Sequence, residues 1–249
     1  YFNVAYECFT GVRKNPPKIN PDNIDSKALS PVMIMLATAQ VMRSIDGLYD
    51  KYNKICGECL DEILNGGYLT ERALLESVTK AGEFIDSPNG RIVNPGHSLE
   101  AAWFIMAEGI VTGNEKAIEV AKHIIDITYP LGWDKDHGGI IAFTDLEGKP
   151  PVQLEWDMKL WWVHNEALIA TLLAYKLTGD KKYWDWFEKI HVWAFGHFAD
   201  KENGEWYGYL RRDGKPTMPS TKGSTFKGPF HVPRCLTMVD TMITELLAE

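Results

Sequence analysis

The chain has 249 residues, 45% of them hydrophobic, which is enough for one sizeable core, and no break in composition divides it into two domains. Its formal net charge of −8 argues against nucleic acid or an anionic membrane surface as a partner, and no apolar run is long enough to span a bilayer. Nine tryptophans favour a pocket in which aromatic rings stack on sugars, although any single one is more readily explained as a core residue.

Four scattered cysteines, Cys8, Cys56, Cys59 and Cys235, fit a reducing compartment, and we expect a cytoplasmic protein. Cys56 and Cys59 form a CxxC pair inside a predicted helix, with no second Cys or His pair nearby. We therefore interpret them as residues of a helix face and predict no metal site there.

Apolar residues at helical spacing, bounded by turn signals, predict eight helices. Ser30 and Pro31 suit the N-cap and the first position of the second helix, which follows a polar connector at 15–26. Gly66, Gly113 and Gly179 mark the ends of three others. In chain order the predicted helices are 1–9, 32–45, 50–64, 98–111, 114–128, 158–178, 182–198 and 231–249.

Three longer loops interrupt the helices. The first, 68–96, is predicted to be irregular and contains a turn signal at Ser87-Pro88-Asn89-Gly90. The second, after Pro130, and the third, around 204–210, contain short β-prone runs that predict a hairpin in each loop. Gly148-Lys149-Pro150 in the second loop recurs as Gly214-Lys215-Pro216 in the third, 66 residues later.

The histidines His97, His164 and His231 are 67 residues apart, and each opens an apolar stretch predicted to be helical. Position 30, where another predicted helix begins, continues the same spacing. This repeat predicts units of an inner helix, an outer helix and a decorated loop. We therefore predict an all-α (α/α)6 toroid of helical hairpins with short β-hairpins on one rim, and a single domain over 1–249.

The four predicted inner helices fall short of a closed ring of six pairs. An arc of four would leave apolar flanks in water, which monomeric proteins seldom do. The first predicted helix also starts in mid-course at Tyr1. We therefore expect an N-terminal part that this chain lacks, of about 130 residues if two repeats are missing.

His97 and His231 are the candidate acid and base, because histidine titrates near neutral pH and two facing imidazoles can take a proton from one face and return one to another. Each sits at a loop-to-helix junction beside Pro or Gly. Glu166 is the candidate pocket carboxylate, because a buried charge in an aromatic setting usually has a partner or a task. The alternative is that Glu166 only caps or pairs within the helix N-terminus.

Six further residues are candidates for contact with a substrate. Glu100 and Arg234 lie one turn after His97 and His231, and a role as salt-bridged scaffold explains them equally well. His137 lies in a rim loop, where contact with ligand and with solvent are equally expected. The full set is Glu100, Trp161, Trp162, His164, Arg234 and His137. The motifs HExxH, paired CxxC and EF-hand are absent, so we predict no metal site. The motifs GxSxG and P-loop are absent too, so the sequence indicates neither a nucleophilic serine nor a nucleotide phosphate site.

The sequence resembles the N-acylglucosamine 2-epimerases, also called renin-binding proteins, from about Pro31 to the C-terminus. Three motifs carry the likeness: Asn94-Pro95-Gly96-His97 with Glu100; residues 154–167, which contain Trp161-Trp162-Val163-His164-Asn165-Glu166; and Phe226-Lys227-Gly228-Pro229-Phe230-His231-Val232-Pro233-Arg234. Cellobiose 2-epimerases and related sugar isomerases share the histidines and differ around them.

The resemblance implies an (α/α)6 barrel, a homodimer, and interconversion of N-acetylglucosamine and N-acetylmannosamine by proton transfer at C2. It assigns the acid/base pair to His97 and His231 and an essential carboxylate to Glu166. On physical grounds we expect the sugar to stack on Trp161 or Trp162. No cofactor is consumed; ATP is expected as an activator without an assignable site. An essential arginine of the family falls in the expected N-terminal part. Two alternatives stay open: an epimerase or isomerase of other sugars, and a non-catalytic binding protein on the same scaffold.

Overall fold

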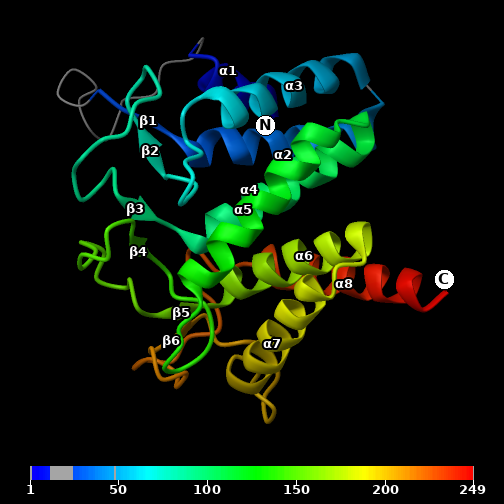
Figure 1. Ribbon diagram of the computed structural model, residues 1–249. Helices are drawn as coiled ribbons and strands as arrows, with labels where there is room; N and C mark the ends of the chain where they lie inside the picture. The colour runs from blue at the N-terminus through cyan, green and yellow to red at the C-terminus, as the bar shows by residue number, and fades with distance from the viewer. Residues whose placement is uncertain (1, 12–24, 48, 249) are drawn as a thin grey trace.

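The computed structural model describes residues 2–11, 25–47 and 49–248 (Figure 1). All eight predicted helices are present in it, so the all-α class is confirmed, while most of the predicted connector at 15–26 lies outside the described residues. The helices are α1 Phe2–Phe9, α2 Leu29–Asp46, α3 Tyr49–Asn65, α4 Pro95–Thr112, α5 Glu115–Gly132, α6 Trp161–Thr178, α7 Lys181–His197 and α8 His231–Ala248.

Four predicted helix boundaries are wrong by three or four residues, and one of them is the start of α4, which lies at Pro95 and not at residue 98. Helix α2 begins at Leu29, one residue before Ser30, and its N-cap Ala28 makes no side-chain hydrogen bond. Pro130 lies inside α5, in its last turn. The segment before α6, predicted to be helical from residue 158, contains the strand β5 (Lys159–Leu160). Helix ends are where local sequence signals are least decisive, because tertiary contacts can extend or cut a turn.

The helices form two layers. Contacts run from α2 to α4, from α4 to α6 and from α6 to α8, and the partners α3, α5 and α7 each pack on the preceding helix of this inner row. The inner helices α4 and α6 are buried on nearly every side: residues 101–104 and 163–172 are buried without interruption. This is typical of helices that are covered all round, whereas an outer helix needs only one apolar stripe.

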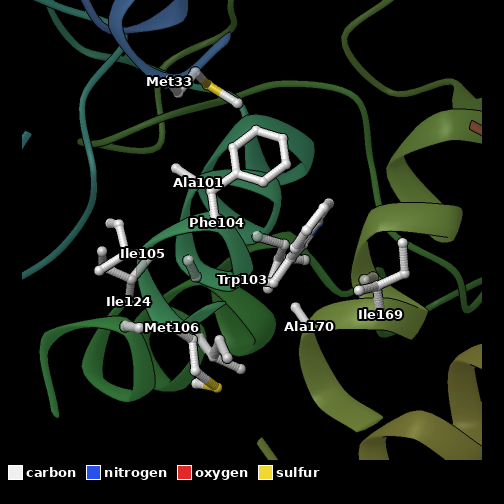
Figure 2. Packing of buried hydrophobic residues seen from close by; sticks show 14 of the residues in the cluster. Met33, Ala101, Trp103, Phe104, Ile105, Met106, Ile124, Ile169 and Ala170 are labelled. Atoms are coloured by element: carbon white, nitrogen blue, oxygen red, sulfur yellow. The ribbon is translucent and has the colours of Figure 1, made fainter. Parts of the chain in front are cut away.

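Figure 2 shows how α4 joins its neighbours in the core. Phe104 points toward Met33 of α2, Ile105 lies beside Ile124 of α5, and Trp103 is directed to the side where Ile169 of α6 lies. All six of these side chains are buried. Helix α4 therefore packs against α2, α5 and α6 in the core.

Among the described residues, six strands of two residues each form three antiparallel pairs at one end of the helices, on the left in Figure 1. Each pair joins different loops. The strands are β1 Lys27–Ala28, β2 Ser77–Val78, β3 Ile92–Val93, β4 Thr144–Asp145, β5 Lys159–Leu160 and β6 Tyr209–Leu210, and the pairs are β1–β2, β3–β4 and β5–β6.

The predicted β structure on one rim is confirmed, and the three strand pairs join separate loops. Within the second and third loops, isolated bridges are formed by Trp133 with Ile140 and by Ala199 with Trp206. The strands β1 and β5 end directly before α2 and α6, and β3 ends two residues before α4 begins. The strand pairs therefore tie neighbouring rim loops together above the starts of the inner helices.

The structural repeat is 66 residues long. Helices α2, α4 and α6 start at 29, 95 and 161, and their C-cap glycines Gly47, Gly113 and Gly179, all left-handed, keep the same interval. Helix α8 starts later, at 231. The three histidines, although equally spaced in the sequence, therefore occupy different positions in their helices. His97 is the third residue of α4, His164 is the fourth of α6 and His231 is the first of α8. In the described part of the chain, no helix is both long and apolar enough to cross a membrane.

Candidate active site

The ring of Trp162 packs against both His97 and His231. Its ring centroid is 5.1 Å from that of His97 and 5.8 Å from that of His231, and both pairs of rings are tilted by about 40°. The three residues come from the first turns of α6, α4 and α8. The structure thus brings the two candidate acid/base residues to one partly exposed aromatic side chain.

Gly96 allows this close approach. A Cβ atom at Gly96 would lie 2.5 Å from the Trp162 ring and 2.8 Å from the Val163 side chain, which is closer than real Cβ contacts. Asn94 caps α4 by accepting a hydrogen bond from the backbone N–H of His97 at 3.1 Å. The Asn-Pro-Gly-His motif therefore starts α4 and leaves room for the indole beside His97.

Each of these histidines is held by a carboxylate at its Nδ1 atom. His231 Nδ1 is 2.7 Å from Glu166 Oε1, and His97 Nδ1 is 3.0 and 2.9 Å from the two carboxylate oxygens of Glu76. An ionised carboxylate can only accept, so Nδ1 carries the proton in both rings. The opposite nitrogen, Nε2, is then the one that can accept a proton in the neutral ring.

Glu166 is completely buried and fully partnered. In addition to its contact with His231, it accepts hydrogen bonds from Trp103 Nε1 at 2.8 Å and from Arg234 Nη2 at 2.6 Å. A buried carboxylate is stable only with such partners. Glu166, the candidate pocket carboxylate, is thus placed where it orients His231.

Glu100 is the equivalent of Glu166 in the 66-residue repeat and belongs to the same network. Arg234 Nη2 donates to Glu100 Oε1 at 3.0 Å, and the Arg234 guanidinium also packs over the rings of Phe230 and Trp103. Burial and the charge of Glu166 together raise the pKa of Glu100 to about 7. Arg234 therefore connects both carboxylates. These contacts fit the alternative in which Glu100 and Arg234 form a structural salt bridge.

The same residues resemble a metal-binding set. Ligand atoms of Glu100, Glu166 and His231 lie within 4.8 Å of one another. Arg234 Nη2 contacts both carboxylates, so a positive charge is already placed between them. Trp103 and Arg234 also line a cavity of about 920 Å³ between α2, α4 and α8, so the network borders open space.

His164 is placed differently from the other two histidines and cannot contact a substrate in this geometry. It is completely buried; its Nδ1 lies 2.8 Å from the Leu160 carbonyl, and its Nε2 accepts the backbone N–H of Ile140 at 3.0 Å. Burial lowers its pKa to about 3, so the ring is neutral. The expectation of substrate contact at His164 is corrected: the ring ties α6 to the second rim loop.

We expect His164→Ala to lower the free energy of unfolding by about 2–4 kcal/mol, because it leaves a cavity and a buried, unpaired Ile140 N–H. Urea unfolding followed by circular dichroism measures this loss. His123→Ala is the matched control, since His123 is exposed on α5 and its loss should change stability by less than about 0.5 kcal/mol. Equal stability of the two variants would contradict the structural role of His164.

Trp161 differs from expectation, whereas substrate contact at His137 stays a prediction. Trp161 is 2% exposed and packs edge-on against Tyr209 and His231, so it supports His231 from behind and offers no face to a sugar. His137 is exposed on the second rim loop and lines a separate pocket of about 390 Å³ with Arg211 and Arg212. Of the two adjacent tryptophans, Trp162 remains the candidate for stacking.

Sequence reasoning missed two residues of the site, Glu76 and Trp103. Glu76 belongs to the loop predicted to be irregular, and no local pattern indicates that this loop folds back onto His97. Trp103 fits an ordinary apolar helix position, and its hydrogen bond to Glu166 depends on the packing of α4 against α6. The interval of 66 residues between Glu100 and Glu166 could have indicated that these two glutamates are equivalent in the repeat. The glycine motifs of the rim loops, at Gly148 and Gly214, are separated by the same interval.

Comparisons with known proteins give relatives of the chain in sequence and in structure. The sequence profile of the family described as N-acylglucosamine 2-epimerase (GlcNAc 2-epimerase) matches residues 30–232. The N-acylglucosamine 2-epimerase of Bos taurus is 40% identical over 100% of this chain and 61% of its own length, and that of Homo sapiens is 40% identical over 88% of this chain and 51% of its own. The chain thus spans little more than half the length of these relatives.

Among solved structures, the cellobiose 2-epimerase from Bacillus thermoamylovorans B4167 has a TM-score of 0.76 at 21% identity, covering 92% of this chain and 57% of that one. At this identity the likeness concerns the fold alone. It supports the predicted architecture of paired inner and outer helices.

Proposed function

Because this chain belongs to the N-acylglucosamine 2-epimerase family, we propose that its protein interconverts N-acetylglucosamine and N-acetylmannosamine by proton transfer at C2. The observation that carries the proposal is the pair His97 and His231, which both contact Trp162 and are each bound to a carboxylate at Nδ1. Such a pair can act on both faces of one carbon atom.

The proposed reaction starts from the open-chain sugar, whose aldehyde at C1 makes the C2 proton acidic. Nε2 of one neutral histidine takes this proton, and the electrons of the C–H bond move into the C1 carbonyl to give an enolate. The opposite histidine, protonated at Nε2, returns a proton to the other face of C2. The carbon is neither oxidised nor reduced overall, so no cofactor is consumed.

The buried network would give the two histidines their orientation during this reaction. Glu166 holds His231, and Arg234 keeps Glu166 in place and balances its charge. Trp162 is the proposed platform for the sugar, because its ring is partly exposed and contacts both imidazoles. Proton transfer by one placed side chain contributes about 10²–10⁴-fold, so binding and orientation must supply the rest.

Deuterated water provides the test. Incubation with N-acetylmannosamine should yield N-acetylglucosamine with deuterium at C2, measured by NMR and mass spectrometry. Exchange with cellobiose or mannose but not with the N-acetyl sugars would assign the reaction of a related sugar isomerase. Binding of the N-acetyl sugars without any exchange would indicate a non-catalytic scaffold.

Other properties expected from the resemblance are proposals of the same kind. ATP is proposed as an activator that is not consumed, and the same exchange assay with and without ATP tests it. A homodimer is proposed as the assembly, which sedimentation velocity measures. A cytoplasmic location and a single domain over 1–249 stay predictions.

A further inference from the structure

We propose that Glu76 is the positioning residue of His97: its carboxylate holds the imidazole by Nδ1 and so presents Nε2 to the sugar. This inference deepens the proposed function and rests on it, because it assigns a task to a residue beside the acid/base pair. Glu76 lies on the first rim loop, 21 residues before His97, and reaches it only through the fold.

The contact itself is well defined. Both carboxylate oxygens lie within hydrogen-bond distance of His97 Nδ1, at 3.0 and 2.9 Å. The side chains are partly covered, 16% exposed for Glu76 and 27% for His97, so water weakens the contact less than on an open surface. On its other side the His97 ring packs against Trp162. Two contacts in different directions therefore determine the orientation of the ring.

The backbone around Glu76 is anchored from both sides. The carbonyl of Glu76 accepts a hydrogen bond from the N–H of Leu29 at 3.0 Å, at the first residue of α2. The next residue, Ser77, starts strand β2, which pairs with β1, and the preceding Leu75 is completely buried. The side chain of Glu76 thus starts from a fixed point on the rim.

The charges around His97 favour its protonated form. Burial of the ring lowers its pKa, but the nearby carboxylate of Glu76, then Glu100 on the same helix and Glu166 on α6, outweigh this and hold the pKa above the ordinary histidine value. Glu76 is the carboxylate in direct contact. Loss of its charge should therefore shift the titration of His97 downward.

The two histidines are held in different ways. The Glu166 carboxylate contacts three side chains inside the helix layer, those of Arg234, Trp103 and His231. The contacts of Glu76 in the described part of the chain give it one side-chain partner, His97. A change at Glu76 should therefore act on His97 and leave the buried network intact.

The first test needs no substrate. NMR titration of the His97 imidazole should give a lower pKa in Glu76→Gln than in the unchanged protein. Glu71→Gln is the matched control, because Glu71 lies exposed on the same loop. An unchanged pKa of His97 in Glu76→Gln would overturn the proposal. If this variant does not fold, Glu76→Ala allows the same measurement.

The second test uses C2 exchange. We expect Glu76→Gln to lower kcat about tenfold, with KM within a factor of about three and the pH profile of kcat moved to lower pH, whereas Glu76→Asp should recover part of the loss. A protein that exchanges C2 deuterium but is unaffected by Glu76→Gln would contradict the positioning role alone. A shifted His97 titration in a protein without exchange would contradict the proposed function and leave the contact standing.

Discussion

Replacement of His231 by alanine will lower the rate of epimerisation by about 10²–10⁴-fold, and replacement of His97 will have an effect of the same order. Each imidazole is proposed to serve one face of C2, so neither can substitute for the other. The fold should survive both changes. Without His231, Glu166 keeps Arg234 and Trp103 as partners, so no buried charge is left alone.

The single variants also separate the two faces of the carbon. With one histidine left, the C2 proton of one epimer can still be removed and returned on the same face. We therefore expect each variant to exchange deuterium into one epimer faster than it converts that epimer into the other. NMR of both sugars in deuterated water measures exchange and inversion together. His123→Ala is the control; near-normal epimerisation in His231→Ala with a loss in His123→Ala would refute the assignment.

Glu166→Gln should reduce turnover at least 100-fold, because the amide keeps the shape and removes the charge that holds His231 Nδ1. A glutamine can also donate a hydrogen bond to Nδ1, which would favour the tautomer with the proton on Nε2 and block its use as a base. Steady-state kinetics in both directions measure the loss.

Glu155→Gln is the matched control in the same segment, since Glu155 is exposed on the second rim loop. It should change turnover by much less than Glu166→Gln. Comparable losses from both variants would mean that the pocket lies at the other end of this segment.

Glu166→Gln should also lower the stability of the fold, whereas the sequence alone suggests that stability is unaffected. A glutamate with only a substrate hydroxyl or a histidine as partner could lose its charge without harm to the fold. In the structure Glu166 is ion-paired with Arg234 and buried, and breaking such a pair typically costs about 3–5 kcal/mol. Glu100 should reduce this cost: without the charge of Glu166 its pKa falls from about 7, and its carboxylate ionises to balance Arg234.

The sequence predicted the helices well because helix formation is encoded locally. Apolar spacing marked all eight, and Gly113 and Gly179, the glycines directly after two helices, take the left-handed conformation of a C-cap. The family and the pair of outer histidines were recognised from motifs, and the profile match confirms the family. His97, His231 and Glu166 were chosen together from the sequence, and the structure brings both histidines to Trp162 and Glu166 to His231.

The even spacing of the three histidines shows the limit of such reasoning. It suggested equivalent positions, but α8 begins later in its repeat, so His231 and His164 occupy different places in their helices. A helix turns about 100° per residue, so a shift of a few positions moves a side chain to another face. His164 accordingly points into the core, where Leu160 and Ile140 bind both ring nitrogens.

The sequence by itself determined the helices, their layers, the family and the residues with acid/base chemistry, since these depend on short patterns and on recognisable motifs. Only the tertiary structure decided which carboxylate meets which histidine, and how the rim strands pair. Glu76 reaches His97 because β2 pairs with β1 and the Leu29 N–H holds the loop. Contacts of this kind join residues far apart in the chain, and their geometry is set by the packing of several elements at once.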